Sequence, residues 1–198
     1  MIGFLKQFRP AHLREFARLV RNRKVEQTED GLLLLGAGVV FRGVQSVLHE
    51  GVWRDHKNLL TTEGLNHMLD VTLHGSSQTG TWYLAPFSGN VTPLATHTAA
   101  TFAATFTELT NTHYSEATRV AFVEGAASAA ATDNYASPAT ITTATSNVTV
   151  YGAGLLSVAT KSSTSGVLLA AAKYASAYSL PTSGGTLGLK YQVSATSA

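Results

Sequence analysis

Residues 81–90 carry the sequence TWYLAPFSGN, and this stretch decides how the rest of the chain is interpreted. Thr81–Phe87 is an alternating segment rich in aromatic side chains, which is typical of a β-strand. A Ser-Gly-Asn sequence follows, and these residue types favour a turn. A strand that ends in a short polar turn indicates a body built mainly from β-structure.

The same design continues to the C-terminus, because short apolar segments alternate with segments rich in Ser, Thr, Gly and Pro. Six to eight strands at this spacing predict a mainly β fold, an antiparallel β-sandwich or jelly roll. Alanine favours helix by propensity, but turn residues flank the alanine run that begins at Leu168, so we expect a strand there. The further expected strands are Thr101–Leu109, Thr118–Glu124, Ala139–Thr145, Asn147–Thr160, Gly166–Ala177 and Thr186–Ser194.

Two elements are expected between the N-terminal segment and the quoted stretch. Val39–Trp53 has a strand-like pattern, and residues 55–58 are expected to form a turn after it. Residues 61–73 predict one short helix that begins at a Thr N-cap, has an acidic residue in its first turn and ends at Gly75. The side chains expected on one face of this helix are Leu65, Met68, Leu69 and Thr72.

The N-terminal segment is basic and has helical periodicity. Its first 24 residues contain seven Lys or Arg residues and one acidic residue, Glu15. Apolar side chains at positions 13, 16, 17 and 20 follow the i, i+3, i+4, i+7 spacing of an amphipathic helix. We therefore predict an amphipathic helix from Pro10 to about Val25. The apolar residues Phe4, Leu5 and Phe8 precede it and need a partner surface.

This basic arm has two interpretations. Its cations are sufficient for electrostatic binding to nucleic acid. Its regular apolar face instead favours docking onto another subunit, with the arginines meeting carboxylates at the rim. An arm that only bound phosphates would not need an apolar face, so nucleic acid is the less favoured partner. The predicted partner-interface residues are Phe4, Phe8, Arg9, Leu13, Arg14, Phe16, Arg18, Val20, Arg21, Arg23 and Lys24.

Composition divides the chain of 198 residues into two parts. Ala, Ser and Thr account for five of the first 60 residues and for 66 of the remaining 138. Because the first strand is expected from Val39, we expect a basic arm over residues 1–38 and a β-sandwich body over residues 39–198. Small, uncharged side chains suit sheet surfaces and contacts between subunits. The net charge of +2 is too small for a protein that binds nucleic acid over its whole surface.

Neither a secretory signal nor a membrane span is expected. Charged residues continue to Lys24, beyond the usual extent of a signal's charged region. The apolar stretch from Gly31 to Phe41 is shorter than the roughly 20 residues that cross a bilayer, so we expect a buried core segment.

The residue types that perform chemistry do not occur at informative spacings. The chain has no Cys, and its seven His residues show no zinc-like pair at i, i+3 or i+4. No Gly-x-Ser-x-Gly sequence or complete glycine-rich phosphate loop is present, and the Gly-x-Gly at 152–154 and at 36–38 favour close packing. Carboxylates at Glu108, Glu116, Glu124 and Asp133 are expected at solvated strand ends and turns. We therefore expect no catalytic residues, no metal, no cofactor and no enzymatic activity.

A carbohydrate- or receptor-binding module is the alternative from a different functional class. Aromatic side chains beside turns can form such a site, although they more often pack in a core. The residues that raise this alternative are Trp82, Tyr83, Phe87, Tyr114 and Tyr135.

Several short motifs of the body are similar to those of a known group of proteins. They are KNLLTTEGLN at 57–66, GTWYL at 80–84, GNVTP at 89–93, YSEATR at 114–119, ASPA at 136–139 and VYGAG at 150–154. Together they resemble small virion structural proteins of tailed bacteriophages, over about residues 57–194. The basic N-terminal helix lies outside the region of resemblance.

Within that group the chain is most similar to head cement or decoration proteins. The resemblance implies a β-sandwich or jelly roll on the outer surface of a capsid, with an arm across neighbouring subunits. It implies the major capsid protein as partner, together with copies of the chain itself on a lattice. A tail or head-tail adaptor component is the alternative within the same group. Identical copies on a lattice could bind through many modest contacts.

Overall fold

The computed structural model describes residues 25–27, 33–35 and 39–197. All eleven predicted partner-interface residues precede Val25 and lie outside the described residues. The amphipathic helix from Pro10 lies outside them as well, except that Val25 belongs to a strand. The predicted helical arm and its interface therefore stay predictions.

The chain forms two compact units. One comprises Met1–Val40 with Thr196–Ala198, and the other Phe41–Ala195. In the first unit, strands β1 (Val25–Gln27) and β2 (Leu33–Leu35) pair in antiparallel fashion.

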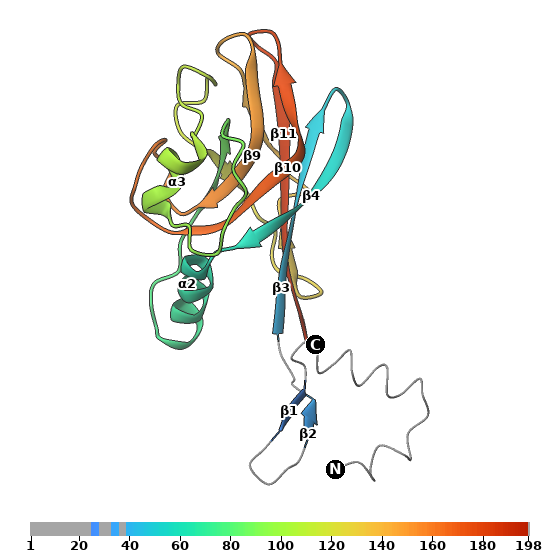
Figure 1. Ribbon diagram of the computed structural model, residues 1–198, viewed down its shortest axis with the longest axis vertical. Coiled ribbons are helices and arrows are strands. Elements are labelled where there is room, and N and C mark those ends of the chain that lie inside the picture. Colours follow the sequence, from blue (N-terminus) through green and yellow to red (C-terminus); the bar gives the residue numbers. More distant parts are fainter. Residues whose placement is uncertain (1–24, 28–32, 36–38, 198) are drawn as a thin grey trace. The chain divides into compact units, whose positions relative to one another are not determined.

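The body is mainly β, as predicted, and is built around a curled antiparallel sheet that forms a half-barrel (Figure 1). Eight strands follow one another in the order β6-β5-β9-β10-β4-β3-β11-β7, and β8 also pairs with β11. The strands are β3 (Val39–His49), β4 (Val52–Leu60), β5 (Trp82–Phe87), β6 (Val120–Phe122), β7 (Ala131–Asp133), β8 (Ala139–Thr142), β9 (Val148–Leu156), β10 (Leu168–Leu180) and β11 (Thr186–Ser197).

The turn expected at residues 55–58 is wrong, because these residues lie in the middle of β4. The chain reverses earlier, at Glu50 and Gly51, where both φ angles are positive, 52° and 76°. Two consecutive positive φ angles fit the tight hairpin turn whose twist matches that of its strands. The polar residues after it continue β4, paired with β3 as far as Lys57 opposite Val44.

The predicted short helix is confirmed as α2 (Thr62–Leu73). Thr61 is its N-cap, and the Thr61 hydroxyl accepts a hydrogen bond from the Gly64 N–H at 3.0 Å. Gly75 follows the helix with a φ of 75°, a left-handed conformation that favours glycine at a helix end.

A second helix, α3 (Ala99–Phe106), replaces most of the strand expected at 101–109, so the described part of the chain has two helices. Ala99, Phe102 and Phe106 lie at i, i+3 and i+7, which places them on one helical face. That face packs on Phe87 of the sheet, with ring centroids 6.0 Å away for Phe102 and 4.9 Å for Phe106. Burial of this face outweighs the strand-like alternation of the sequence.

Two apolar clusters hold the body together. The larger cluster contains side chains from β3, β5, β6 and β8 to β11, including Leu84, Ile141 and Tyr191. The smaller one joins α3 to β5, β9 and β10. The alanine run of β10 is confirmed as a strand and is buried from Leu168 to Ala172. The neighbouring strand β9 approaches this run closely at Gly152, where an added Cβ would overlap the carbonyl oxygen of Ala172.

Candidate functional site

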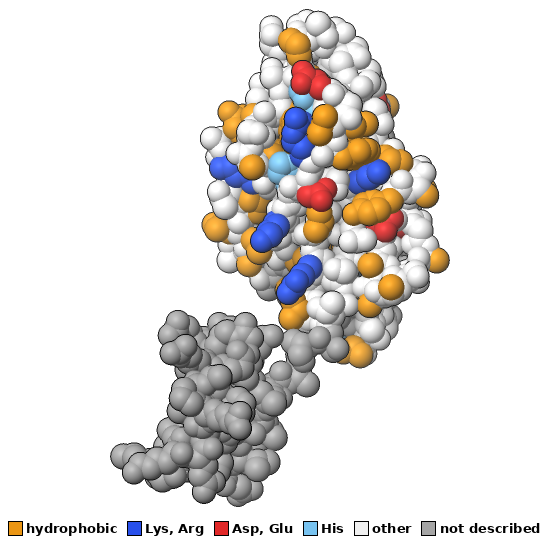
Figure 2. Space-filling view, turned by 90° about the vertical axis from the view of Figure 1, so that its right-hand side faces the viewer, with side chains coloured by type: hydrophobic (Ala, Val, Ile, Leu, Met, Phe, Trp, Pro, Cys, Tyr) orange, Lys and Arg blue, Asp and Glu red, His pale blue; other side chains and the backbone are white. Residues whose placement is uncertain are grey.

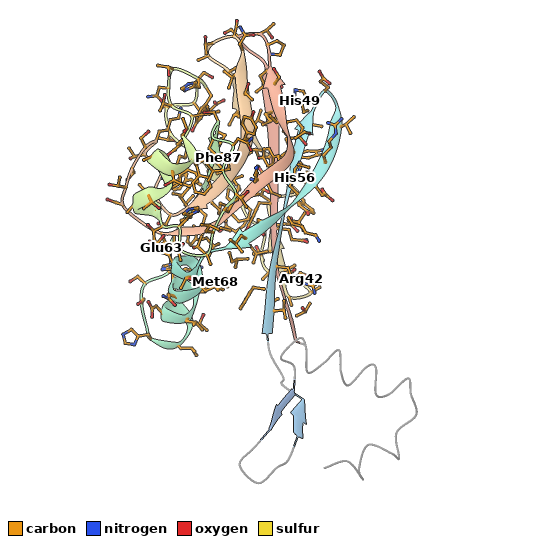
Figure 3. All side chains as sticks on the ribbon, in the orientation of Figure 1. Arg42, His49, His56, Glu63, Met68 and Phe87 are labelled. Atoms are coloured by element: carbon orange, nitrogen blue, oxygen red, sulfur yellow. The ribbon has the colours of Figure 1, made fainter. Side chains whose placement is uncertain are left out.

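Helix α2 is attached to the body through the polar groups of its first turn. The N–H of Thr61 donates to the carbonyl oxygen of Leu169 at 3.0 Å. One carboxylate oxygen of Glu63 accepts hydrogen bonds from the N–H of Ala99 at 2.8 Å and from the N–H of Leu168 at 2.7 Å. Glu63 therefore ties α2 to both α3 and β10, and Figure 3 shows it where the helix meets the strands.

The inward side of α2 is also fixed by close packing. Gly64 is buried, and a Cβ at this position would overlap the backbone of Leu169. One turn later His67 packs edge-on against Trp82, with ring centroids 5.6 Å apart. The His67 Nε2 atom is 3.0 Å from the hydroxyl oxygen of Thr79. These contacts set the rotation of the helix about its own axis.

The opposite side of α2 presents a row of leucines to solvent. Leu65, Leu69 and Leu73 are 36%, 56% and 79% exposed, and we call these three residues the leucine stripe. They lie at i, i+4 and i+8, so they follow one another along one side of the helix. The face predicted from the sequence is therefore divided: Met68 is half-buried, whereas Leu65 and Leu69 face outward. The predicted face did not include Leu73, which the structure places in the exposed row.

Charge on α2 is exclusively acidic. The helix contains Glu63 and Asp70 and has no Lys or Arg. Glu63 is occupied by backbone N–H groups, whereas Asp70 is exposed beside the leucine stripe. The last turn has no basic residue to balance the negative end of the helix dipole. The exposed side of α2 therefore combines an apolar stripe with negative potential.

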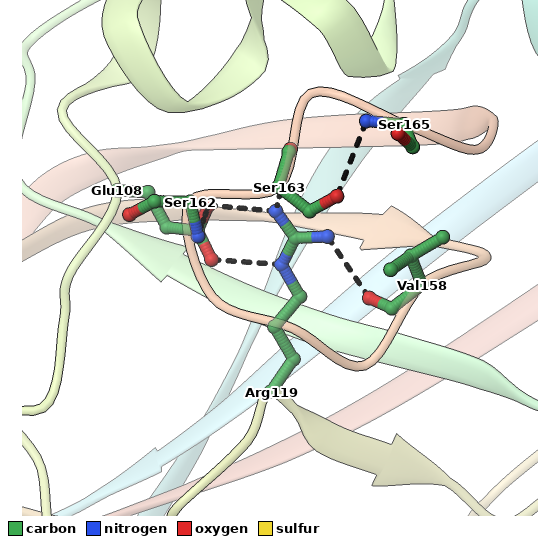
Figure 4. A network of polar contacts seen from close by, with 6 residues as sticks. All are labelled: Glu108, Arg119, Val158, Ser162, Ser163 and Ser165. Carbon is green, nitrogen blue, oxygen red and sulfur yellow. Dashed lines mark hydrogen bonds and ion pairs between the residues drawn. The ribbon is translucent and has the colours of Figure 1, made fainter.

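The carboxylate of Glu108 is buried in an ion pair rather than exposed at a strand end, so the expectation for this residue is wrong. Arg119 Nε and Nη2 each lie 2.8 Å from a different oxygen of Glu108, and both side chains are fully buried (Figure 4). Arg119 Nη1 also donates to the carbonyl oxygen of Val158 at 2.9 Å. The Ser162 N–H donates to Glu108 at 3.1 Å. This carboxylate fixes a loop and is not free to act on a substrate.

A second basic residue braces the same loop. Lys161 Nζ donates to the carbonyl oxygen of Tyr114 at 3.2 Å and lies 3.2 Å from the centre of the Tyr114 ring. It also donates to the carbonyl oxygen of Glu116. Burial raises the pKa of the Tyr114 hydroxyl far above its usual value, and the negative charge of Glu108 adds to the effect. Tyr114 is therefore a neutral core side chain.

Two histidines of the β3–β4 hairpin belong to a cluster of rings with β10. His56 Nε2 lies 2.8 Å from the hydroxyl of Tyr178, and the His56 ring packs against Tyr174 at 4.6 Å between centroids. His49 packs against Tyr178, with ring centroids 5.3 Å apart. Figure 3 labels both histidines. Burial lowers the pKa of His56, and Arg54 acts in the same direction while Asp55 opposes it. The cluster holds an irregular part of β10, where the register shifts between Lys173 and Tyr178.

The five aromatic residues that suggested a glycan site do not share one surface. Phe87 and Tyr114 are fully buried, and Trp82 and Tyr83 are partly buried. Tyr135 is 41% exposed. It lies near Lys190, whose Nζ is 5.4 Å from the Tyr135 ring centre and 4.1 Å from that of Trp53.

A cavity of about 470 Å³ lies beside α2 and the sheet. Apolar side chains from α2 and five strands line it, together with polar and acidic side chains. These residues are Met68, Trp82, Phe122, Leu155, Leu169 and Val193, with Gln78, Thr79, Glu124 and Thr132.

Figure 2 shows one face of the body, on which basic and acidic side chains are scattered among uncharged ones. In the part of the chain that the structure describes, no group of three or more His, Cys, Asp and Glu residues could hold a metal ion. Among those residues, no helix has the length and apolar character needed to cross a membrane.

No known protein family, curated protein or solved structure matches this chain. A functional conclusion therefore depends on the residues and on their arrangement in the body.

Proposed function

We propose that the chain is a non-enzymatic structural protein of a bacteriophage virion that binds to the capsid shell and stabilises it. The observation that carries the proposal is the leucine stripe on α2. Contiguous exposed apolar groups on a well-packed body are typical of protein interaction surfaces. The stripe is thus one apolar surface that can bind a partner. The sequence of the basic N-terminal segment predicts a second.

The composition of the body supports the same role. Exposed positions on its strands are often Ala, Ser or Thr, for example Thr140, Ala175 and Ser176. Such side chains lose little rotamer freedom when a neighbour covers them. On a lattice of identical copies, many modest contacts of this kind accumulate into firm attachment. The motif resemblance to small phage virion proteins implies that this lattice is a shell of the major capsid protein.

The polar groups of the body also suit a structural role. Glu108, the most deeply buried acid described above, is neutralised by Arg119, and one carboxylate oxygen of Glu63 accepts two hydrogen bonds from backbone N–H groups. Both hold loops and helices in place. The proposal includes the finer features expected from the sequence, a jelly-roll type of body and an N-terminal helical arm that contacts neighbours.

Labelling of virus particles tests this proposal. Gold-labelled antibodies against the chain would be applied to particles assembled from the genome that encodes it. Labels spread over the whole shell are the expected result. A single cluster at one vertex would favour the alternative, a tail or head-tail adaptor protein, and intact particles that carry no label would overturn both.

A glycan-binding module is the second candidate, and the exposed rings of Tyr135 and Trp53 beside Lys190 favour it. Exposed aromatic rings with a polar neighbour can bind a sugar ring face-on. A glycan array probed with the full chain and with Tyr135→Ala tests it. Binding that disappears in this variant, with an unchanged circular dichroism spectrum, would support the glycan candidate, and absence of binding would exclude it.

A further inference from the structure

We propose that the leucine stripe is the docking site for the N-terminal segment of a second copy of the chain, residues 10–24. This inference rests on the proposed structural role and specifies a contact through which copies join. Three features support this pairing: the fixed orientation of α2, the match in length between two apolar faces, and their opposite charges.

Rotation of α2 cannot bury the leucine stripe within its own body. Turning the helix inward would break the two hydrogen bonds that Glu63 accepts from Ala99 and Leu168. It would also move a side chain into the space beside Leu169 that only Gly64 fits. The outward position of the leucines is therefore set by the packing of the opposite face, and covering them requires a surface from outside the Phe41–Ala195 body.

The N-terminal segment offers an apolar face of matching length. Leu65 and Leu73 are eight residues apart, which corresponds to about 12 Å along a helix axis. In the helix predicted from the sequence, Leu13 and Val20 would lie seven residues and about 10 Å apart along the axis, with Phe16 between them. Two such faces can pack side by side and exclude water over two helical turns.

The charges of the two surfaces are complementary. Arg14, Arg18 and Arg21 flank the apolar positions of the N-terminal segment. On α2 the exposed Asp70 lies beside the stripe, and the helix has no Lys or Arg that would repel these arginines. The negative end of the α2 dipole is unbalanced and adds to the attraction. A second α2 would bring only like charges, so stripe-to-stripe pairing is less favourable.

A contact between an arm and a stripe is heterologous, because it uses different surfaces on the two copies. Each copy has one arm and one stripe, so the contact can repeat from copy to copy. It therefore either closes between two copies that exchange arms or continues into larger rings and open chains.

Sedimentation velocity of the full chain over a range of concentrations tests the inference. Wild type is expected to form dimers or larger species as concentration rises. Leu69→Asp and Phe16→Asp should each remain monomeric. The control Val52→Asp changes a valine that is 49% exposed at the β3–β4 turn, and it should associate like wild type. Circular dichroism spectra establish that all variants are folded.

Mixing the two monomeric variants identifies the pairing. Leu69→Asp retains an intact arm and Phe16→Asp retains an intact stripe, so an equimolar mixture should form one heterodimer and no larger species. A mixture that stays monomeric, or a Phe16→Asp variant that associates like wild type, would overturn the inference.

A parallel binding experiment with capsid shells separates this inference from the proposed function. Wild-type protein that remains monomeric up to its solubility limit, yet binds to shells, would overturn the arm–stripe contact and leave capsid binding intact. Protein that associates through the stripe but does not bind to shells would support the contact and contradict the proposed function.

Discussion

The guanidinium of Arg119 and the carboxylate of Glu108 form a two-pronged ion pair, with both N–O distances at 2.8 Å and neither side chain exposed to solvent. The same two side chains bind backbone groups of Val158 and Ser162, so the pair fixes the loop that follows β9. Removal of one partner would leave the other charge buried without compensation.

We expect Arg119→Met to lower the free energy of unfolding by about 3 to 5 kcal/mol, because it leaves the Glu108 carboxylate buried without a positively charged partner. The double variant Arg119→Met/Glu108→Leu should lose less than the sum of the single variants, because it leaves no unpaired charge. Urea unfolding measures both. Glu124→Gln removes an exposed carboxylate and is the control, expected within about 0.5 kcal/mol of wild type. Strict additivity of the single variants would contradict the pairing.

The same pair should protect the loop from proteolysis. Lys161 lies in the loop, between the residues that Arg119 and Glu108 hold. Trypsin should therefore cleave after Lys161 faster in Arg119→Met than in Glu124→Gln at the same temperature. Equal cleavage rates in the two variants, measured by mass spectrometry under native conditions, would show that the pair does not anchor this loop.

The stability of the body should fall as the pH drops below about 6.5 because of His56. Burial lowers the pKa of His56 in the folded chain, so the unfolded chain takes up the proton first. The contribution of this residue is fully present above pH 6.5 and is lost as the pH falls through the folded-state pKa, with a slope below about 1.4 kcal/mol per pH unit.

Urea unfolding of His56→Gln and His74→Gln over this pH range checks that expectation. His74 is exposed at the end of α2 and serves as the matched control. The difference between His56→Gln and wild type should shrink on acidification, whereas the control should follow wild type. An unchanged difference down to pH 4 would show that His56 does not titrate as argued.

A methyl group added at Gly64 should destabilise the chain although it favours the helix. Gly to Ala in a helix interior ordinarily gains up to about 1 kcal/mol. At this position the added Cβ would overlap the backbone of Leu169, and overpacking costs about 1 to 3 kcal/mol. Gly80→Ala, with no atom within 4 Å of the added Cβ, is the control and should be neutral. A more stable Gly64→Ala variant in thermal unfolding would contradict the close contact between α2 and β10.

Local rules are sufficient to predict α2, whereas α3 depends on distant contacts. The Thr61 cap and the Gly75 stop both act within a few residues, so a sequence reveals them. Residues 101–106 read TFAATF, which fits alternation as well as a helical period. Contact with Phe87 favours the helix, because Phe102 and Phe106 pack against Phe87 from the same helical face.

The misplaced turn in β4 has a similar cause. Four polar residues in succession, 55–58, indicate a turn when only neighbours are considered. Two of them face tyrosines far along the chain: His56 meets the hydroxyl of Tyr178, and Asn58 donates to the hydroxyl of Tyr191. Hydrogen-bond partners more than 120 residues away cannot be deduced from the sequence.

The candidate site was predictable only in part. Periodicity indicates which side chains of α2 share a face, but not which side the body occupies. Gly64 was the available signal, because a glycine inside a helix often marks close approach of another backbone. The charge complementarity became apparent only when Leu65, Leu69 and Asp70 were found on the exposed side of α2.

Binding of the full chain to capsid shells tests the central claim most directly. Shells assembled from the major capsid protein encoded by the same genome, but lacking this chain, would be mixed with wild type and sedimented, and their disruption followed on heating. We predict saturable binding at many copies per shell and a higher disruption temperature. Absence of the chain from the sedimented shells at every concentration, with no change in their heat resistance, would contradict a capsid-binding function.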